Sequence, residues 1–194
     1  ASPLICYLSE QHRQKGNSLD KILNEIRSGN VSEVSKSLLR SAKLNSVENA
    51  PKLYTHNYDV ENINRLEMSK LKADPHFFDA FKKGNPKMLE MLKSNVRTDE
   101  KLELKIGAKV MFIKNNFEKG YINGSLGTVA DFTEEGTPVV DIKDGNRIIC
   151  ELEKWAIEDE SGKALASFEQ YPLRAAWAIT VHKSQGMTLE SAEI

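Results

Sequence analysis

The sequence predicts an α/β fold that is interrupted by a small all-β segment. In the first half of the chain, apolar residues recur at helical spacing between short apolar runs of strand length. From Leu102 onward, short apolar runs alternate with turn residues, as in a small barrel. After Pro172 an apolar strand restores the α/β character. The β segment is therefore predicted to be an insertion.

Length and composition are those of an ordinary globular protein. The chain has 194 residues, of which 40% are hydrophobic and 28% charged. No apolar run reaches membrane-spanning length and no signal peptide is visible, so we expect a cytoplasmic protein without a membrane partner. The net charge of −1 lacks the basic excess of a stand-alone nucleic-acid binder. Cys6 and Cys150 stand far apart and the four histidines are scattered, so we expect reduced cysteines and no metal site.

The first elements are a strand and two helices. Pro3 to Leu8 is an apolar run of strand length. Ser18 is expected to cap a helix that ends at Gly29. Asn30 with Glu33 three residues later resembles a capping box for a second helix. The apolar positions of the two helices are Leu19, Ile22, Leu23 and Ile26, and Val31, Val34 and Leu38.

A loop, a strand and a helix come next. Residues 41–51 are polar and end at a proline, so we expect a loop there. Residues 52–56 have the pattern of a short strand, and Asn57 or Asp59 can cap the helix after it. Residues 87–93 also have a helical pattern. The buried side of the helix after residue 56 is expected to carry Val60, Ile63 and Leu71.

Turn residues divide the β segment. Asp144-Gly145 indicates a hairpin, since both turn positions need positive φ. Asn123-Gly124 and Gly127 are expected to serve a tight turn and a close backbone approach. The predicted strands are residues 108–113, 127–132, 138–142 and 147–152.

Aromatic residues of the β segment have two interpretations. Phe117, Tyr121 and Lys119 could offer a stacking and charged surface to a single strand of nucleic acid. The commoner alternative is that such aromatics are buried in a barrel. Trp155 and Trp177 are expected in the core.

The most informative stretch is residues 176–189, AWAITVHKSQGMTL. It begins as a buried strand and continues into hydrogen-bonding side chains, which can donate to phosphate oxygens without reading sequence. A catalytic His-Ser pair is disfavoured, because no positioned carboxylate is identifiable. The polar residues are Thr180, His182, Lys183, Ser184 and Gln185, followed by Gly186.

A second polar group stands where a strand meets a helix, at Thr55, His56 and Asn57. The free N–H groups and the dipole of a helix N-terminus attract anions. An ordinary capped helix explains the same residues. Spacing alone favours the capped helix.

Segments along nearly the whole chain match one family pattern in the right order, and TVHKSQG preceded by AWA is the most specific of them. Together they resemble the second motor domain of superfamily 1B DNA helicases of the RecD-like, Pif-type branch. The matching segments are Leu8–Gln14 with the helix at 22–29; Leu53–Asn57 with Val60 and Asn64; Leu104–Met111; Asn123–Gly127; and Gln170–Leu173 running into residues 176–189.

The resemblance implies a RecA-like domain formed by residues 1–104 and 173–194, with an SH3-like barrel inserted at 105–172. Such helicases have two RecA-like domains, and the first carries the phosphate loop G-x-x-x-x-G-K-[ST] and an acidic magnesium-binding motif. Neither motif is present here. We therefore expect a C-terminal motor fragment that does not hydrolyse ATP alone. ATP and Mg²⁺ would be ligands of the complete enzyme, and the missing N-terminal RecA-like domain and single-stranded DNA would be the partners.

The resemblance also implies roles for individual residues. Arg13 with Gln14 would approach the γ-phosphate, where an arginine finger raises turnover by roughly 10³ to 10⁵. The residues that would contact single-stranded DNA are Thr180, His182, Lys183 and Ser184. For Thr55, His56 and Asn57, the resemblance makes contact with DNA as plausible as helix capping. Gln185 and Gly186 would couple the DNA to the nucleotide.

Two other functions stay open from sequence. The chain could belong to a RecD-type subunit of an exonuclease complex or to a helicase module of a relaxase. It could also be a nucleic-acid-binding module with no motor role, in which case a phosphate loop would be missing from its parent gene.

Overall fold

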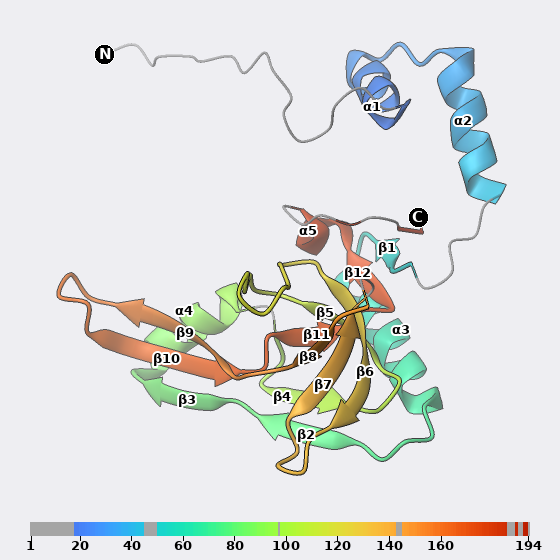
Figure 1. The fold of residues 1–194 in the computed structure, drawn as a ribbon. Coiled ribbons are helices and arrows are strands. Elements are labelled where there is room, and N and C mark those ends of the chain that lie inside the picture. The colour runs from blue at the N-terminus through green and yellow to red at the C-terminus, as the bar shows by residue number, and fades with distance from the viewer. Residues whose placement is uncertain are drawn as a thin grey trace, which may run out of the picture. The chain divides into compact units, whose positions relative to one another are not determined.

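The computed structural model describes residues 18–44, 50–96, 98–142, 145–185, 189 and 192–193 (Figure 1). The chain divides into two compact units, residues 1–46 and 47–194. The predicted strand at residues 3–8 lies outside the described residues, as do Arg13, Gln14 and Gly186.

The first unit contains the two predicted helices, α1 (Ser18–Ser28) and α2 (Glu33–Leu44). Gly29 ends α1 with a positive φ of 76°. The predicted capping box of Asn30 and Glu33 is wrong, because Ser32 directly precedes α2 and its Oγ accepts from the backbone N–H of Ser35 at 3.3 Å. Ser32 in turn donates its N–H and hydroxyl to the Glu25 carboxylate. Helix α2 also continues through residues 41–44, where we expected loop.

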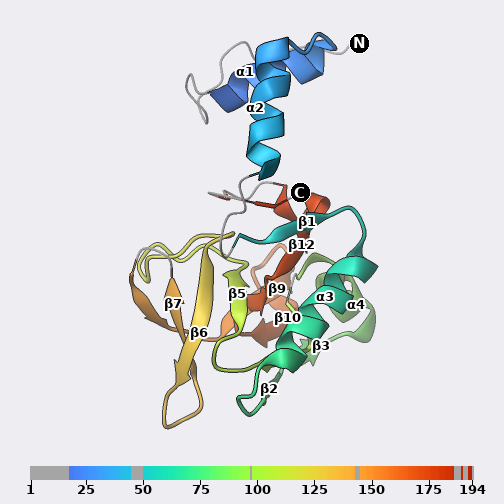
Figure 2. The ribbon, with the colours of Figure 1, turned by 90° about the vertical axis from the view of Figure 1, so that its right-hand side faces the viewer.

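The second unit contains a small α/β part. Strands β1 (Lys52–Tyr54) and β12 (Ala178–Thr180) pair in parallel, and each leads into a helix, α3 (Asn57–Lys70) and α5 (Val181–Ser184). Both views show α3 beside this pair (Figure 2).

Helix α3 differs from the prediction at its start and along its buried side. His56 is its N-cap and makes no side-chain cap hydrogen bond, so the expected caps Asn57 and Asp59 are wrong. The fully buried residues are spaced by four and are Val60, Asn64 and Met68. Of the expected positions only Val60 is fully buried, and Ile63 and Leu71 are half-buried.

The β part has three sheets among the described residues. Their strand orders are β11-β5-β6-β7-β8, β3-β10-β9 and β2-β4. The five-stranded sheet has two free ends, β11 and β8, so the expected closed barrel is not seen in the residues that the structure describes. The elements are β2 (His76–Asp79), β3 (Phe81–Gly84), α4 (Pro86–Asn95), β4 (Lys101–Leu104), β5 (Lys109–Phe112), β6 (Leu126–Phe132), β7 (Pro138–Ile142), β8 (Arg147–Ile149), β9 (Glu153–Glu158), β10 (Ala164–Gln170) and β11 (Leu173–Ala175).

The four strands predicted for the β segment are confirmed as β5 to β8, each within three residues of its expected ends. The β7–β8 hairpin is confirmed as well, with Gly145 at φ 83° and its N–H donating to Ile142 O at 3.0 Å. Strands β2, β3, β4, β9, β10 and β11 were not predicted.

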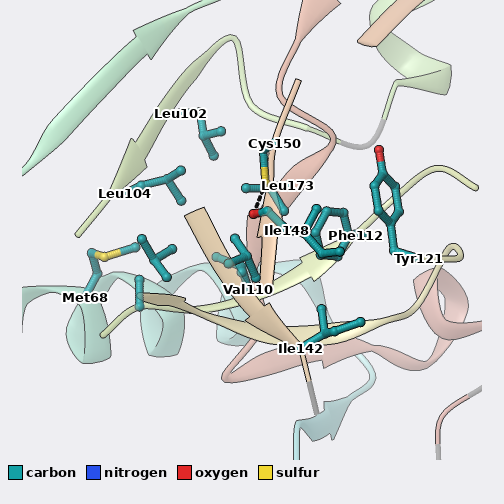
Figure 3. Close-up of a cluster of buried hydrophobic side chains, with 13 residues drawn as sticks. Met68, Leu102, Leu104, Val110, Phe112, Tyr121, Ile142, Ile148, Cys150 and Leu173 are labelled. Atoms are coloured by element: carbon teal, nitrogen blue, oxygen red, sulfur yellow. Dashed lines mark hydrogen bonds between the residues drawn. The ribbon is translucent and has the colours of Figure 1, made fainter. Parts of the chain in front are cut away.

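The main core lies under the five-stranded sheet (Figure 3). Phe112 and Tyr121 stack with ring centroids 4.0 Å apart. Cys150 is fully buried, and this burial raises the pKa of its thiol to about 12, so the thiol is protonated and inert near neutral pH. Trp155 and Trp177, which were expected in the core, are half-buried and pack against the core clusters.

Gly127 has the predicted close approach. A Cβ atom at this position would lie 2.5 Å from Val140 Cγ1 and 2.9 Å from the Asp141 carbonyl oxygen. Because the backbone of β7 cannot move as a flexible side chain does, strands β6 and β7 can pair at this spacing only with glycine there.

We predict that Gly127→Ala lowers the free energy of unfolding by about 1–3 kcal/mol, the usual range for an overpacked core. Urea unfolding measures the change. Val140→Ala removes one of the two clashing groups, so the double variant should be less destabilised than the sum of the single variants. Strict additivity would show that the clash with Val140 is absent.

Candidate functional site

Two polar segments predicted to contact phosphates meet at one edge of the small parallel sheet. Leu53 aligns with Ile179 and Tyr54 with Thr180. Because the carboxyl ends of parallel strands lie at the same edge, residues 55–57 and 181–184 follow neighbouring strand ends. The structure therefore brings together two groups that are far apart in the sequence.

Thr180 is the buried member of the site. It is 2% exposed, and its Oγ1 accepts from the backbone N–H of Lys183 at 3.2 Å. The hydroxyl therefore caps α5. Buried in this way, it orients the turn that follows rather than reaching a bound molecule.

The residues after β12 form a tight turn. The Ser184 hydroxyl donates to Val181 O at 2.8 Å, and the Gln185 N–H reaches His182 O at 3.3 Å. His182 and Gln185 are exposed, whereas Lys183 and Ser184 are half-buried. The imidazole of His182 is thus an accessible hydrogen-bond donor on this turn.

The residues after β1 are all exposed. Thr55 Oγ1 and His56 Nδ1 are 2.8 Å apart, which holds the imidazole against the threonine and leaves Nε2 for an outside partner. Since the side chain of the N-cap residue His56 makes no cap hydrogen bond, the first turn of α3 presents backbone N–H groups at the same place. This junction offers hydrogen-bond donors with a favourable helix dipole.

Asn64 on helix α3 holds the strand that leads into the site, and it was not predicted from the sequence as a site residue. It is 8% exposed and bonds through its amide to the backbone of β12. The available signal was its place between Val60 and Met68 at a spacing of four, which puts a polar residue on an apolar helix face.

Each of the two interpretations of the aromatic residues in the β segment holds for one of them. Phe117 is 78% exposed, but Tyr121 is 2% exposed, and burial raises the pKa of its hydroxyl to about 12, with the Glu153 carboxylate adding to the shift. Lys119 pairs with Glu151. Only Phe117 is therefore placed for stacking.

Within the described residues, no cluster of three or more His, Cys, Asp or Glu side chains could hold a metal ion. The helices in this part of the chain are also too short or too polar to cross a membrane.

Comparison with known proteins decides the family. Residues 87–132 match the family described as DNA helicase Pif1, 2B domain. ATP-dependent DNA helicase Pif1 from Psychrobacter sp. (strain PRwf-1) is 39% identical over 98% of this chain, and the human protein of that name is 33% identical over 99%. The chain belongs to the Pif1-type helicase family. It spans 38% and 31% of the lengths of these two relatives.

Solved Pif1 structures agree with this assignment. A structure of Bacteroides sp. Pif1 in complex with ADP-AlF4 matches with a TM-score of 0.77 at 30% identity, over 93% of this chain and 43% of that one. A structure of Bacteroides Pif1 bound to single-stranded DNA matches with a TM-score of 0.61, also at 30% identity, over 93% and 43%. The Pif1-type fold thus covers most of the chain.

The cap at Thr180 can be tested directly. Thr180→Val keeps the branched shape but removes the acceptor for the Lys183 N–H, so we expect the free energy of unfolding to fall by about 1 kcal/mol. Thr180→Ser keeps the hydroxyl and should retain most of the stability. Urea unfolding of both variants measures the difference, and equal stability of Thr180→Val and the unchanged chain would contradict the capping role.

Proposed function

We propose that this chain supplies the second motor domain of an ATP-dependent DNA helicase, including part of its single-stranded DNA track. The shared edge of β1 and β12 is the main support, because it carries two segments of hydrogen-bonding residues side by side. The family supports the motor role, since the relatives are ATP-dependent DNA helicases by name.

The proposed DNA track combines both junctions. His56 and Asn57 donate from the first junction, and His182 and Lys183 donate from the second, because the hydroxyls of Thr55 and Ser184 are already hydrogen-bonded within their own junctions. These groups and the first-turn N–H groups of α3 suit phosphate oxygens, which carry no sequence information. Thr180 acts indirectly, by holding the second junction in shape. With a net charge of −1 the chain should bind DNA weakly when alone.

The nucleotide site is proposed to lie between this domain and a facing RecA-like domain. Arg13, supported by Gln14, would stabilise the charge that spreads over the γ-phosphate oxygens, and Gln185 and Gly186 would couple that site to the DNA. The phosphate loop is absent from this sequence, so ATP and Mg²⁺ are assigned mainly to the facing domain. In the complete protein, closure of the cleft would move DNA along both domains.

The proposed domain division follows the family. Residues 1–104 and 173–194 would form the RecA-like domain and residues 105–172 the insert. Pairing of β11 with β5 and of β3 with β10 joins the insert to its flanks. We therefore infer that the insert and its flanks act as one rigid support for β12.

The first test concerns the nucleotide. In the complete protein, Arg13→Ala should lower DNA-stimulated ATP turnover by roughly 10³ or more, because an uncompensated γ-phosphate charge slows phosphoryl transfer. Binding of a fluorescent ATP analogue should stay close to that of the unchanged protein. Arg13→Lys keeps the charge but not the forked geometry and should rescue little. Normal turnover in Arg13→Ala would remove this residue from the site.

The second test concerns the DNA track. His56→Ala removes the exposed imidazole, so we expect the affinity of the complete protein for single-stranded oligonucleotides to fall by about tenfold, the effect of one lost contact. Thr55→Val should produce a smaller loss, because His56 remains but is no longer held by the hydroxyl.

Fluorescence anisotropy across a salt series measures both variants. Phe77→Ala, at an exposed position of β2 in the antiparallel β2–β4 pair, is the matched exposed control. An affinity of His56→Ala equal to that of the control would refute the proposed contact.

A further inference from the structure

The amide of Asn64 completes the outer edge of β12. Its Nδ2 donates to Ala178 O at 2.9 Å and to Ala175 O at 3.4 Å, and its Oδ1 accepts from Ala178 N at 2.9 Å. One side chain therefore takes both backbone groups of Ala178. It does what a neighbouring strand would do at that residue.

The geometry explains why a side chain is needed there. On its inner edge β12 pairs with β1, where the Lys52 N–H donates to Trp177 O at 2.9 Å. The peptide groups of Ala178 consequently point to the other edge. Ala178 is 0% exposed, so water does not replace the missing partners, and an unpaired group at this depth is costly.

The hydrogen bonds of Asn64 connect helix α3 to strand β12 and thereby connect the two junctions. Helix α3 begins at the first junction, residues 55–57, and β12 runs into the second junction, residues 181–184. The two junctions are therefore connected twice. The pairing of β1 with β12 is one connection, and the hydrogen bonds between Asn64 of α3 and Ala178 of β12 are the other. With Asn64 in place, α3 can neither slide along β12 nor rotate away from it without breaking two hydrogen bonds.

We propose that Asn64 is a positioning residue that holds the two strand–helix junctions at one fixed spacing, so that both engage the same single strand of nucleic acid. The proposal rests on the proposed DNA contact of these junctions. Asparagine suits the role because one short side chain presents a donor and an acceptor in one plane. Aspartate has the same shape but, when ionised, lacks the donor for Ala178 O.

The test compares Asn64→Asp and Asn64→Ala with Val140→Ala in the complete protein. Val140 is fully buried in the five-stranded sheet, so its truncation destabilises the fold away from the junctions. Oligonucleotide affinity is measured across a salt series, at a temperature where near-ultraviolet circular dichroism shows every variant folded. We expect both Asn64 variants to bind about tenfold more weakly and to lower the salt slope by about one, since one junction disengages. Val140→Ala should keep both values.

Each other outcome has a distinct meaning. Equal effects of the Asn64 variants and Val140→Ala, with unchanged salt slopes, would reduce Asn64 to a stability role and overturn the positioning proposal. Normal binding by the Asn64 variants alongside weak binding by His56→Ala would overturn it too. Normal binding by both would instead overturn the proposed DNA contact.

Amide hydrogen exchange of the unchanged protein gives a measurement that needs no variant. Strong protection of the Ala178 amide is expected if Asn64 seals the strand edge. Rapid exchange of this amide would overturn the proposal even if the Asn64 variants fail to fold.

Discussion

The parallel pairing of β1 with β12 is the constraint on which the second unit depends. Only three residues on each strand take part, yet the strands come from opposite ends of the unit. Closing so long a loop costs conformational entropy that three residue pairs do not offset. The stabilisation must therefore come from what packs around the pair. Ile179 lies in a cluster with Met111, Ile113 and Ala176, and Leu53 packs against it.

That cluster makes the β part a support for the edge of β1 and β12 that carries the candidate site. Met111 belongs to β5 and Ile113 directly follows it, so the five-stranded sheet packs beneath the parallel pair. The backbone adds to this connection, because Ala176 N donates to Lys109 O at 2.9 Å. A strain that moves β5 would thus be transmitted to β12 and to the turn after Thr180. The insertion is in this sense a structural part of the site, although it supplies few of the site's side chains.

The sequence predicted the elements with strong local signals and missed those defined by distant partners. Helix α1 has a clear apolar period and was predicted. The strand β3 is exposed at all four residues and is a strand because it pairs with β10, which no local pattern reveals. In β9 the exposed positions carry Lys154, Ala156 and Glu158, and this weak alternation was hidden among charges. The α3 cap was wrong for the opposite reason, because good capping residues stand at 57 and 59 but the helix begins before they can act.

In the candidate site, too, the sequence predicted where the polar residues lie but not which of their side chains are buried. The residue pattern correctly predicted a polar segment after a buried strand, but it could not show which hydroxyl faces inward. Thr180 and Ser184 are chemically alike, yet Thr180 is 2% exposed whereas the side chain of Ser184 is partly accessible. The difference follows from position, since the last residue of a buried strand points into the packing between β12 and its neighbours. The hydroxyls of Thr55, Thr180 and Ser184 all take part in hydrogen bonds within the site, so the proposed phosphate track relies on imidazole, ammonium, amide and backbone N–H donors. Such donors bind the backbone of a nucleic acid without reading its bases, which is the property that a translocating motor requires.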